Sequence, residues 1–117
     1  MKIKEIGEFG LIEDLAEIVS SGREVIKGIG DDAAVLSGIQ GKEYLLLATD
    51  SIAENIHFVR NAGADRIGRK ALGVNLSDIA AMGGIPLWAL INLGIPGDLS
   101  VEFCRNLYRG FTGLAEE

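Results

Sequence analysis

Two short segments of this chain are apolar without interruption, and they constrain the fold more than any other feature. The first is LLLA at residues 45–48, which leads into the polar triplet TDS, and the second is LWALINLGI at residues 87–95. Continuous apolar runs are typical of strands covered on both faces. Both segments therefore predict buried strands. A short apolar stretch at 33–36 precedes the first segment, and the turn-forming residues 38–42 lie between the two. This order predicts that 33–36 and 45–48 form an antiparallel pair of strands.

Three other segments have the apolar spacing of helices. Residues 11–19 carry one apolar stripe, which Ser20, Ser21 and Gly22 should end. Within residues 64–82, one helical face carries Ile67, Ala71, Val74 and Asp78. Ser100 is a good N-cap for a last helix, whose buried face is predicted to carry Phe103, Leu107, Phe111 and Leu114. Helices mixed with an adjacent antiparallel strand pair predict an α+β or mixed α/β class.

Composition narrows the functional classes. The 117 residues carry a net charge of −6 and a pI near 4.7, which argues against nucleic acid as a partner. The single cysteine, Cys104, excludes an internal disulfide and favours a reducing cytoplasm. The longest apolar run, at 85–95, is broken by Pro and Gly and is too short to cross a membrane.

Two adjacent carboxylates, Asp31 and Asp32, lie in the glycine-rich stretch GIGDDAAV. Gly-Asp-Asp is an ordinary turn sequence, so one interpretation is a solvated turn. The other is functional, because a carboxylate pair on a turn supplies the hard oxygen ligands that Mg²⁺ prefers. Taken alone, the stretch leaves both interpretations open.

Two further aspartates extend the magnesium hypothesis. Asp50, between Thr49 and Ser51, is either a strand end meeting water or part of an oxygen-donor set for a metal that carries phosphates. Asp78 continues an apolar helical face, where it must be hydrogen-bonded, paired or metal-bound, and Asn75 is placed to share its site. Capping of a neighbouring loop is the alternative for Asp78. Three Asp sites together favour Mg²⁺ holding a polyphosphate in this acidic chain.

The only histidine, His57, lies between two apolar residues and is either a packing residue or a ligand contact. An extended chain separates it from Asp50 by no more than about 25 Å, so a ligand with two ends could touch both. Tyr108 could stack on a base or pack. Four cations are candidates for phosphate contact or for a solvated face: Arg60, Arg66, Arg69 and Lys70.

The ordered motifs of the chain resemble one enzyme family. GEFGLIEDL, GDDAAV, LLLATDSIAENIHF and GRKALGVNLSDIAAMGGIPLWAL look like the N-terminal domain of the thiamine-monophosphate kinase family, in order and spacing. The most specific parts are TDS, HF and NLSDIAAMG. GDD alone is shared across the wider aminoimidazole ribonucleotide synthase-like (PurM-like) superfamily.

The resemblance implies ATP-dependent phosphorylation of thiamine monophosphate to thiamine diphosphate, by direct γ-phosphoryl transfer with several Mg²⁺ ions. It places His57 on the family's substrate-binding histidine and Tyr108 beside the nucleotide. By position it implies the metal ligands Asp32, Thr49, Asp50 and Asp78. It implies no catalytic general base, because charge neutralisation and in-line positioning supply most of the rate in phosphoryl transfer.

The resemblance also implies an architecture. The expected fold is a PurM-like mixed α/β domain with a four-stranded mixed sheet, helices on one face, and sheets that pair across a homodimer. Residues 1–117 would be the ATP- and Mg-binding and dimerisation domain of a longer two-domain protein. Its partners would be thiamine monophosphate, ATP and a second copy, with no nucleic acid and no membrane.

Three departures from the family pattern bear on these expectations. Ala48 stands where many members have a second Thr or Ser, and Asn55 stands where Gly is common. The chain also stops before the family's Gly-Gly-Asp nucleotide loop and second domain, so the piece alone is expected to lack a complete active site. The alternatives are a non-catalytic nucleotide-binding or dimerisation module, and another superfamily member such as a hydrogenase-maturation-type ATP-using enzyme.

Overall fold

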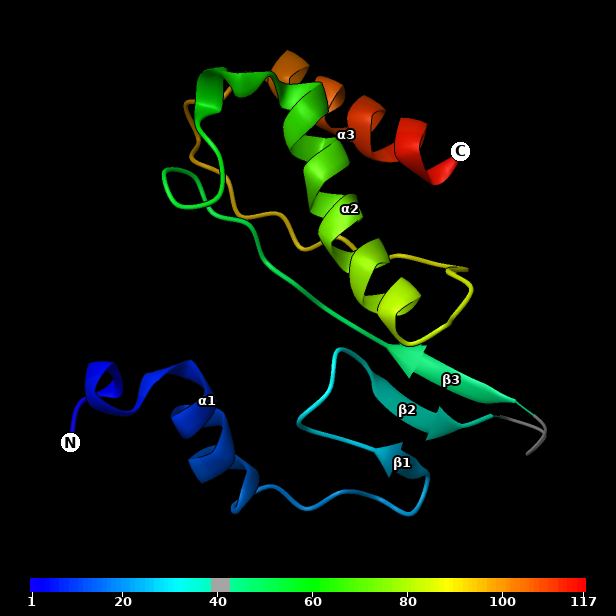
Figure 1. The fold of residues 1–117 in the computed structure, drawn as a ribbon. Helices are drawn as coiled ribbons and strands as arrows, with labels where there is room; N and C mark the ends of the chain where they lie inside the picture. The colour runs from blue at the N-terminus through cyan, green and yellow to red at the C-terminus, as the bar shows by residue number, and fades with distance from the viewer. Residues whose placement is uncertain (39–42) are drawn as a thin grey trace. The chain divides into compact units, whose positions relative to one another are not determined.

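A computed structural model describes residues 1–38 and 43–117, which divide into two compact units, Met1–Ala48 and Thr49–Glu117. The first unit contains helix α1 and strands β1 to β3, and the second contains the short helix η1 with helices α2 and α3 (Figure 1). No helix in the described part of the chain combines the length and the apolar character needed to cross a membrane.

The first unit is built around a three-stranded antiparallel sheet in the order β1-β2-β3. These strands span Val25–Lys27, Ala34–Ser37 and Tyr44–Leu47. Ala34 is opposite Leu47 and Ser37 is opposite Tyr44, which confirms the predicted antiparallel pair. The turn predicted at 38–42 lies largely outside the described residues, but Gly38 is described. A Cβ on Gly38 would lie 2.0 Å from the Glu43 carbonyl oxygen, so this approach of the two strands requires glycine.

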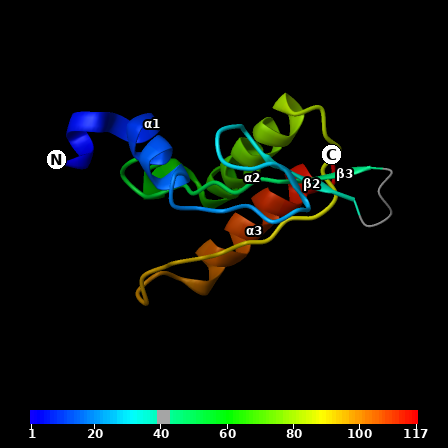
Figure 2. The ribbon, with the colours of Figure 1, turned by 90° about the horizontal axis from the view of Figure 1, so that it is seen from below.

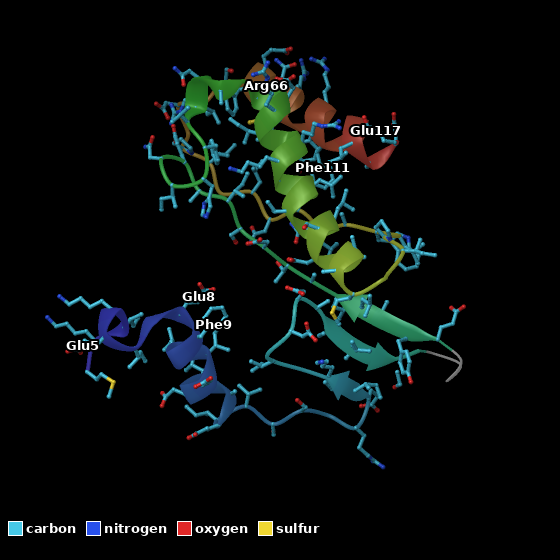
Figure 3. The ribbon with its side chains drawn as sticks, viewed as in Figure 1. Glu5, Glu8, Phe9, Arg66, Phe111 and Glu117 are labelled. Carbon is cyan, nitrogen blue, oxygen red and sulfur yellow. The ribbon has the colours of Figure 1, made fainter. Side chains whose placement is uncertain are left out.

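Helix α1 spans Ile3–Ala16, so it begins and ends earlier than the predicted stripe at 11–19. It is kinked at Gly7, whose φ of 71° lies in the left-handed region. After Ala16 the Ile18 amide donates to the Leu15 carbonyl, a bond three residues back that is typical of a 3₁₀ turn. Ile18 itself lies outside the helix. Phe9 of α1 is 78% exposed (Figure 3).

The core of the second unit is the pair of helices α2 (Ala64–Ala81) and α3 (Val101–Ala115), which pack side by side (Figures 1 and 2). Two glycines allow their backbones to approach. A Cβ on Gly68 would lie 1.9 Å from the Leu107 carbonyl oxygen, and one on Gly110 would lie 1.8 Å from the Asp65 carbonyl oxygen. Any larger residue at either position would force the helices apart.

The predicted N-cap of α3 and the predicted stripe of α2 are confirmed, whereas the apolar face predicted for α3 is only half-buried. The Ser100 hydroxyl accepts a hydrogen bond from the Phe103 amide at 3.0 Å, which makes Ser100 the N-cap of α3. On α2, Ile67 is 3% exposed, and Asp78 further along the same stripe is half-buried. The inward face predicted for residues 64–82 therefore exists.

Two strand predictions need correction. Residues 87–95 form no strand, and their side chains are open to solvent: Trp88 is 85% and Leu90 102% exposed. The described sheet accordingly has three antiparallel strands, not the four of a mixed sheet. Strand β3 forms as predicted but is not covered on both faces, since Leu47 is 52% exposed. An extended segment becomes a strand only where another backbone pairs with it, and no described residue pairs with 87–95.

Candidate functional site

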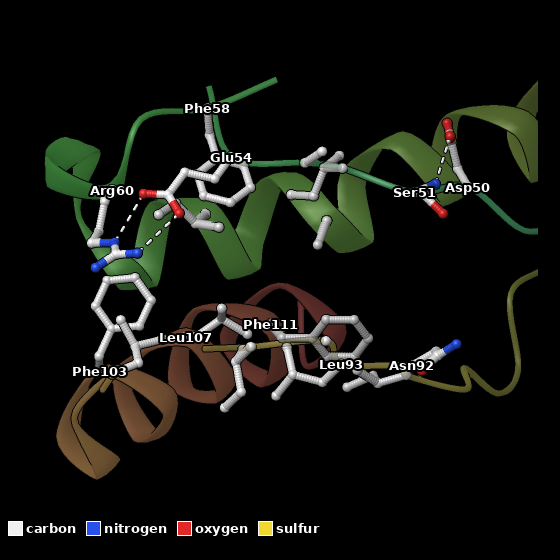
Figure 4. Close-up of a pocket in the computed structure, with 18 of the residues that line it drawn as sticks. Asp50, Ser51, Glu54, Phe58, Arg60, Asn92, Leu93, Phe103, Leu107 and Phe111 are labelled. Carbon is white, nitrogen blue, oxygen red and sulfur yellow. Dashed lines mark hydrogen bonds and ion pairs between the residues drawn. The ribbon is translucent and has the colours of Figure 1, made fainter. Parts of the chain in front are cut away.

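A cavity of about 730 Å³ lies within the second unit, and its lining includes the polar side chains of Asp50, Glu54 and Arg60 (Figure 4). It is bounded by residues 49–54, by α2, by residues 90–96 and by α3. Its walls are largely apolar, with Phe103, Leu107 and Phe111 supplied by α3. We call it the Asp50 cavity. An apolar hollow of this size with a few polar groups is typical of small-molecule sites.

The oxygen donors predicted around Asp50 line one end of this cavity. Thr49, Asp50 and Ser51 follow Ala48, which comes directly after β3, and all three are exposed. One carboxylate oxygen of Asp50 accepts the Ser51 amide at 2.8 Å, which orients the side chain. The set consists of a carboxylate and hydroxyl groups with no His or Cys, and this chemistry fits a hard cation such as Mg²⁺.

The two predicted partners on α2 differ in their placement. Asn75 lines the Asp50 cavity, and its amide nitrogen donates to the Ala71 carbonyl at 3.0 Å. Asp78 is half-buried on the same helix but is not among the residues that line the cavity. Neither unit, in residues 1–38 and 43–117, gathers three or more His, Cys, Asp or Glu side chains as a metal site. The metal-ligand set, including Asp32 of the first unit, stays a prediction.

The adjacent aspartates of the first unit have separate surroundings. Asp31 forms an ion pair with Lys27 at 2.7 Å and accepts the Asp32 amide at 2.8 Å. The hydrogen bond from Lys27, followed by that from the Asp32 amide, lowers the pKa of the Asp31 carboxyl. Both contacts of Asp31 are therefore local to the turn.

His57 lies in a tightly hydrogen-bonded loop, residues 53–60, which we call the His57 loop. The Ala53 amide donates to Nδ1 of His57 at 2.8 Å, and the His57 amide donates to the Ala53 carbonyl at 2.9 Å. Asn55 has a φ of 66°, a left-handed conformation in which Gly or Asn is favoured over other residues. Asn55, which stands where the family commonly has glycine, can therefore adopt the same left-handed backbone conformation that glycine would.

A second, shallower hollow of about 470 Å³ adjoins the His57 loop. Its wall includes His57 together with two cations of α2, Arg66 and Lys70, spaced one turn apart. The Lys70 ammonium donates to the His57 carbonyl, which ties the loop to the helix. The two cations give this hollow a more positive wall than the Asp50 cavity has, because that cavity is lined by Asp50, Glu54 and Arg60.

An ion pair that the sequence analysis did not predict closes the His57 loop. Arg60 donates to both carboxylate oxygens of Glu54, at 2.9 and 3.1 Å (Figure 4). Glu54, with a smaller contribution from Asp98, raises the pKa of the Arg60 guanidinium. Six residues separate the pair in a non-helical segment, so no periodic signal could have revealed it.

The remaining predicted residues lie away from the Asp50 cavity. Arg69 pairs with Glu117 at 2.9 Å, near the C-terminal end shown in Figure 3, and so is a surface charge. Tyr108 lies on α3, is 41% exposed and lines neither hollow. Its predicted place beside a nucleotide stays a prediction.

Comparison with known proteins decides the family. Residues 30–117 match the family described as AIR synthase related protein, N-terminal domain. The chain belongs to this family. It is also 44% identical over 116 residues to the thiamine-monophosphate kinase of Aquifex aeolicus, and 37% identical over 110 residues to that of Bacillus subtilis. These alignments cover 99% and 93% of the chain, and 36% and 34% of the two relatives.

A solved structure supports the same relationship. The fold matches that of AaThiL complexed with AMPPCP and TMP with a TM-score of 0.87, at 40% identity, over 99% of this chain and 35% of that one. The mixed α/β PurM-like fold is thereby confirmed. The chain spans about a third of the length of the relatives it matches.

Proposed function

We propose that this chain is the N-terminal part of an enzyme that phosphorylates thiamine monophosphate to thiamine diphosphate with ATP. The observation that carries the proposal is the match to AaThiL, whose structure holds AMPPCP and TMP. We interpret these ligands as a non-hydrolysable ATP analogue and thiamine monophosphate. The identity of 44% to a thiamine-monophosphate kinase over nearly the whole chain supports the same substrates.

The proposed chemistry depends on placing charge rather than on a proton-transfer residue. The chemistry that Mg²⁺ would supply when bound is neutralisation of phosphate charge. The residues that would hold it are Asp32, Thr49, Asp50 and Asp78. The Ser51 amide contributes by fixing the orientation of the Asp50 carboxylate, so little reorganisation would be needed on binding. No residue of this chain is assigned as a general base.

His57 and Tyr108 would bind the two substrates. His57 is exposed beside a hollow that also carries Arg66 and Lys70, which suits a polar, phosphate-bearing molecule such as thiamine monophosphate. Tyr108 is exposed on α3 and would lie beside the nucleotide. Both assignments come from the family pattern, and the structure leaves both side chains accessible.

A homodimer and a cytoplasmic location complete the proposal. The segment 85–95 leaves large apolar side chains exposed, and β3 does so within its own unit. Monomeric proteins rarely expose large continuous apolar patches, so these surfaces favour further protein contacts. A second copy of the chain is the partner that the family resemblance implies. The lone Cys104, which is not in a disulfide, is compatible with a reducing compartment.

The test is a kinase assay on the intact protein and three variants. Asp50→Asn and Asp78→Asn should each lower kcat about 100-fold or more, because a neutral amide cannot replace a carboxylate ligand of Mg²⁺. Asp65→Asn is the matched control, since Asp65 is an exposed carboxylate in the first turn of α2. Near-normal turnover by either of the first two variants, with folding intact, would refute the metal assignment.

A further inference from the structure

The hydrogen bonds of the His57 loop determine which nitrogen of the imidazole carries the proton. The Ala53 amide donates to Nδ1 of His57 at 2.8 Å. A backbone amide can only donate, so Nδ1 must be the unprotonated acceptor of the neutral ring. The proton of the neutral imidazole then resides on Nε2, which becomes a hydrogen-bond donor.

The loop is built to hold the ring in this state. The His57 amide returns a hydrogen bond to the Ala53 carbonyl at 2.9 Å, so residues 53 and 57 are joined twice. The Asn55 amide donates to the Phe58 carbonyl at 2.7 Å across the tip. These bonds fix the backbone on both sides of the imidazole.

Two charged contacts hold the loop, one from α2 and one within the loop itself. Lys70 of α2 donates to the His57 carbonyl, and this contact joins the histidine backbone to the helix. The Glu54–Arg60 pair joins the beginning of the loop to its end. His57 itself is exposed, and no residue in the described ranges forms a hydrogen bond with its Nε2.

We propose that the His57 loop selects the Nε2–H tautomer and presents this N–H as a donor to thiamine monophosphate, with Lys70 as a positioning residue. The inference rests on the proposed function, because it assumes that His57 contacts that substrate. Thiamine monophosphate offers acceptors of two kinds, the ring nitrogens of its aminopyrimidine and the oxygens of its phosphate. Either kind can accept a hydrogen bond from the Nε2–H group.

The first experiment reads the tautomer directly. The intact protein is labelled with ¹⁵N-histidine, its two-bond ¹H–¹⁵N correlations are recorded at about pH 8.5, above the usual histidine range, and His57→Gln identifies the His57 signals. We expect Nδ1 in the unprotonated range and Nε2 in the protonated range. The opposite pattern, or a fast-exchanging mixture of both tautomers, would overturn the proposal.

Ligand additions then identify the acceptor. Thiamine shares the aminopyrimidine but lacks the phosphate, whereas inorganic phosphate supplies only the oxygens. We expect thiamine monophosphate and one of these two probes to shift the Nε2 signal of His57. If neither thiamine monophosphate nor either probe shifts it, the proposed contact is wrong.

A kinetic comparison tests Lys70 as a positioning residue. Lys70→Met should raise KM for thiamine monophosphate about three- to tenfold, the range of one lost hydrogen bond, and leave kcat within about twofold because no reacting atom is involved. Lys70→Arg keeps a donor and should restore KM. Arg69→Met is the matched control, since Arg69 pairs with Glu117 and should leave KM unchanged.

The outcomes separate this inference from the proposed function. If Lys70→Met leaves both KM and the His57 signals unchanged, Lys70 is not a positioning residue, even though the enzyme is a kinase. If the intact protein forms no thiamine diphosphate but shows the Nε2–H tautomer, the proposed function fails while the selection of the tautomer stands.

Discussion

The helix pair α2–α3 and the segment 85–95 are both rich in apolar side chains, yet only the helix pair is packed. Leu72 in α2 is 6% exposed, whereas Leu90 in the segment is 102% exposed. A helix satisfies its backbone hydrogen bonds internally and needs only a complementary face. An extended segment needs a second backbone beside it. Apolar composition therefore predicts that a segment will be covered, and it does not predict what covers it.

The contrast can be tested with the same substitution in both regions. Leu72→Ala should lower the free energy of unfolding of the 117-residue chain by about 2–4 kcal/mol, because it leaves a cavity beside α3. Leu90→Ala should change it by less than about 0.5 kcal/mol, because the side chain touches little. Chemical denaturation followed by circular dichroism measures both values.

The same two variants in the intact protein sharpen the comparison. If the segment is covered there, by a second copy or by further chain, Leu90→Ala should become destabilising while Leu72→Ala keeps its cost. A large cost for Leu90→Ala in the 117-residue chain itself would contradict the exposed placement of the segment.

A single methyl group should disrupt the packed region. Gly110→Ala places a carbon where the Asp65 carbonyl oxygen of α2 now lies, so the intact protein should lose about 1–3 kcal/mol of unfolding free energy or more. Gly113→Ala on the same helix meets nothing within 4 Å and should gain about 0.5–1 kcal/mol through helix propensity. Equal effects of the two substitutions on the thermal unfolding midpoint would show that the helices do not cross at Gly110.

The His57 loop differs from both regions, since backbone conformation rather than packing limits its sequence. Asn55→Ala should cost about 1 kcal/mol, because φ is 66° and alanine lacks the local hydrogen bonding of asparagine. Asn55→Gly, which restores the residue common in the family, should be neutral or slightly stabilising. Loss of stability in the glycine variant, measured by urea denaturation, would contradict the left-handed assignment.

The smallest expected effect is electrostatic and lies in the first unit. Lys27→Met should raise the pKa of Asp31 toward its ordinary value, because the largest cause of its depression is the hydrogen bond from Lys27. A depressed pKa contributes stability above the unfolded-state pKa, and that contribution disappears as the pH falls through the folded-state value. Wild type and variant should therefore converge in stability at acidic pH. Carboxyl NMR titration that shows the same Asp31 pKa in both proteins would refute the pairing.

Features with local causes were predictable from the sequence. Ser100 caps its helix because a hydroxyl at that position accepts an amide three residues later, and the stripe that contains Ile67 and Asp78 follows from helical periodicity. The β2–β3 pair follows from two apolar runs that flank turn residues. Each of these depends on residues that are close together in the chain.

Features that depend on partners were not predictable in the same way. The missing fourth strand at 87–95 depends on a backbone beside it, which no local pattern encodes. The Glu54–Arg60 pair depends on the path of a non-helical loop, and the Lys70 contact with the His57 carbonyl depends on how that loop meets α2. The glycine requirement at positions 68 and 110 becomes visible only when two helices are placed together.

The most direct test of the central claim is the stoichiometry of phosphoryl transfer by the intact protein. The protein is incubated with thiamine monophosphate, ATP and Mg²⁺, and thiamine diphosphate and ADP are quantified by chromatography. We expect equal amounts of the two products. ADP release without thiamine diphosphate, or no reaction under conditions in which a known thiamine-monophosphate kinase works, would contradict it.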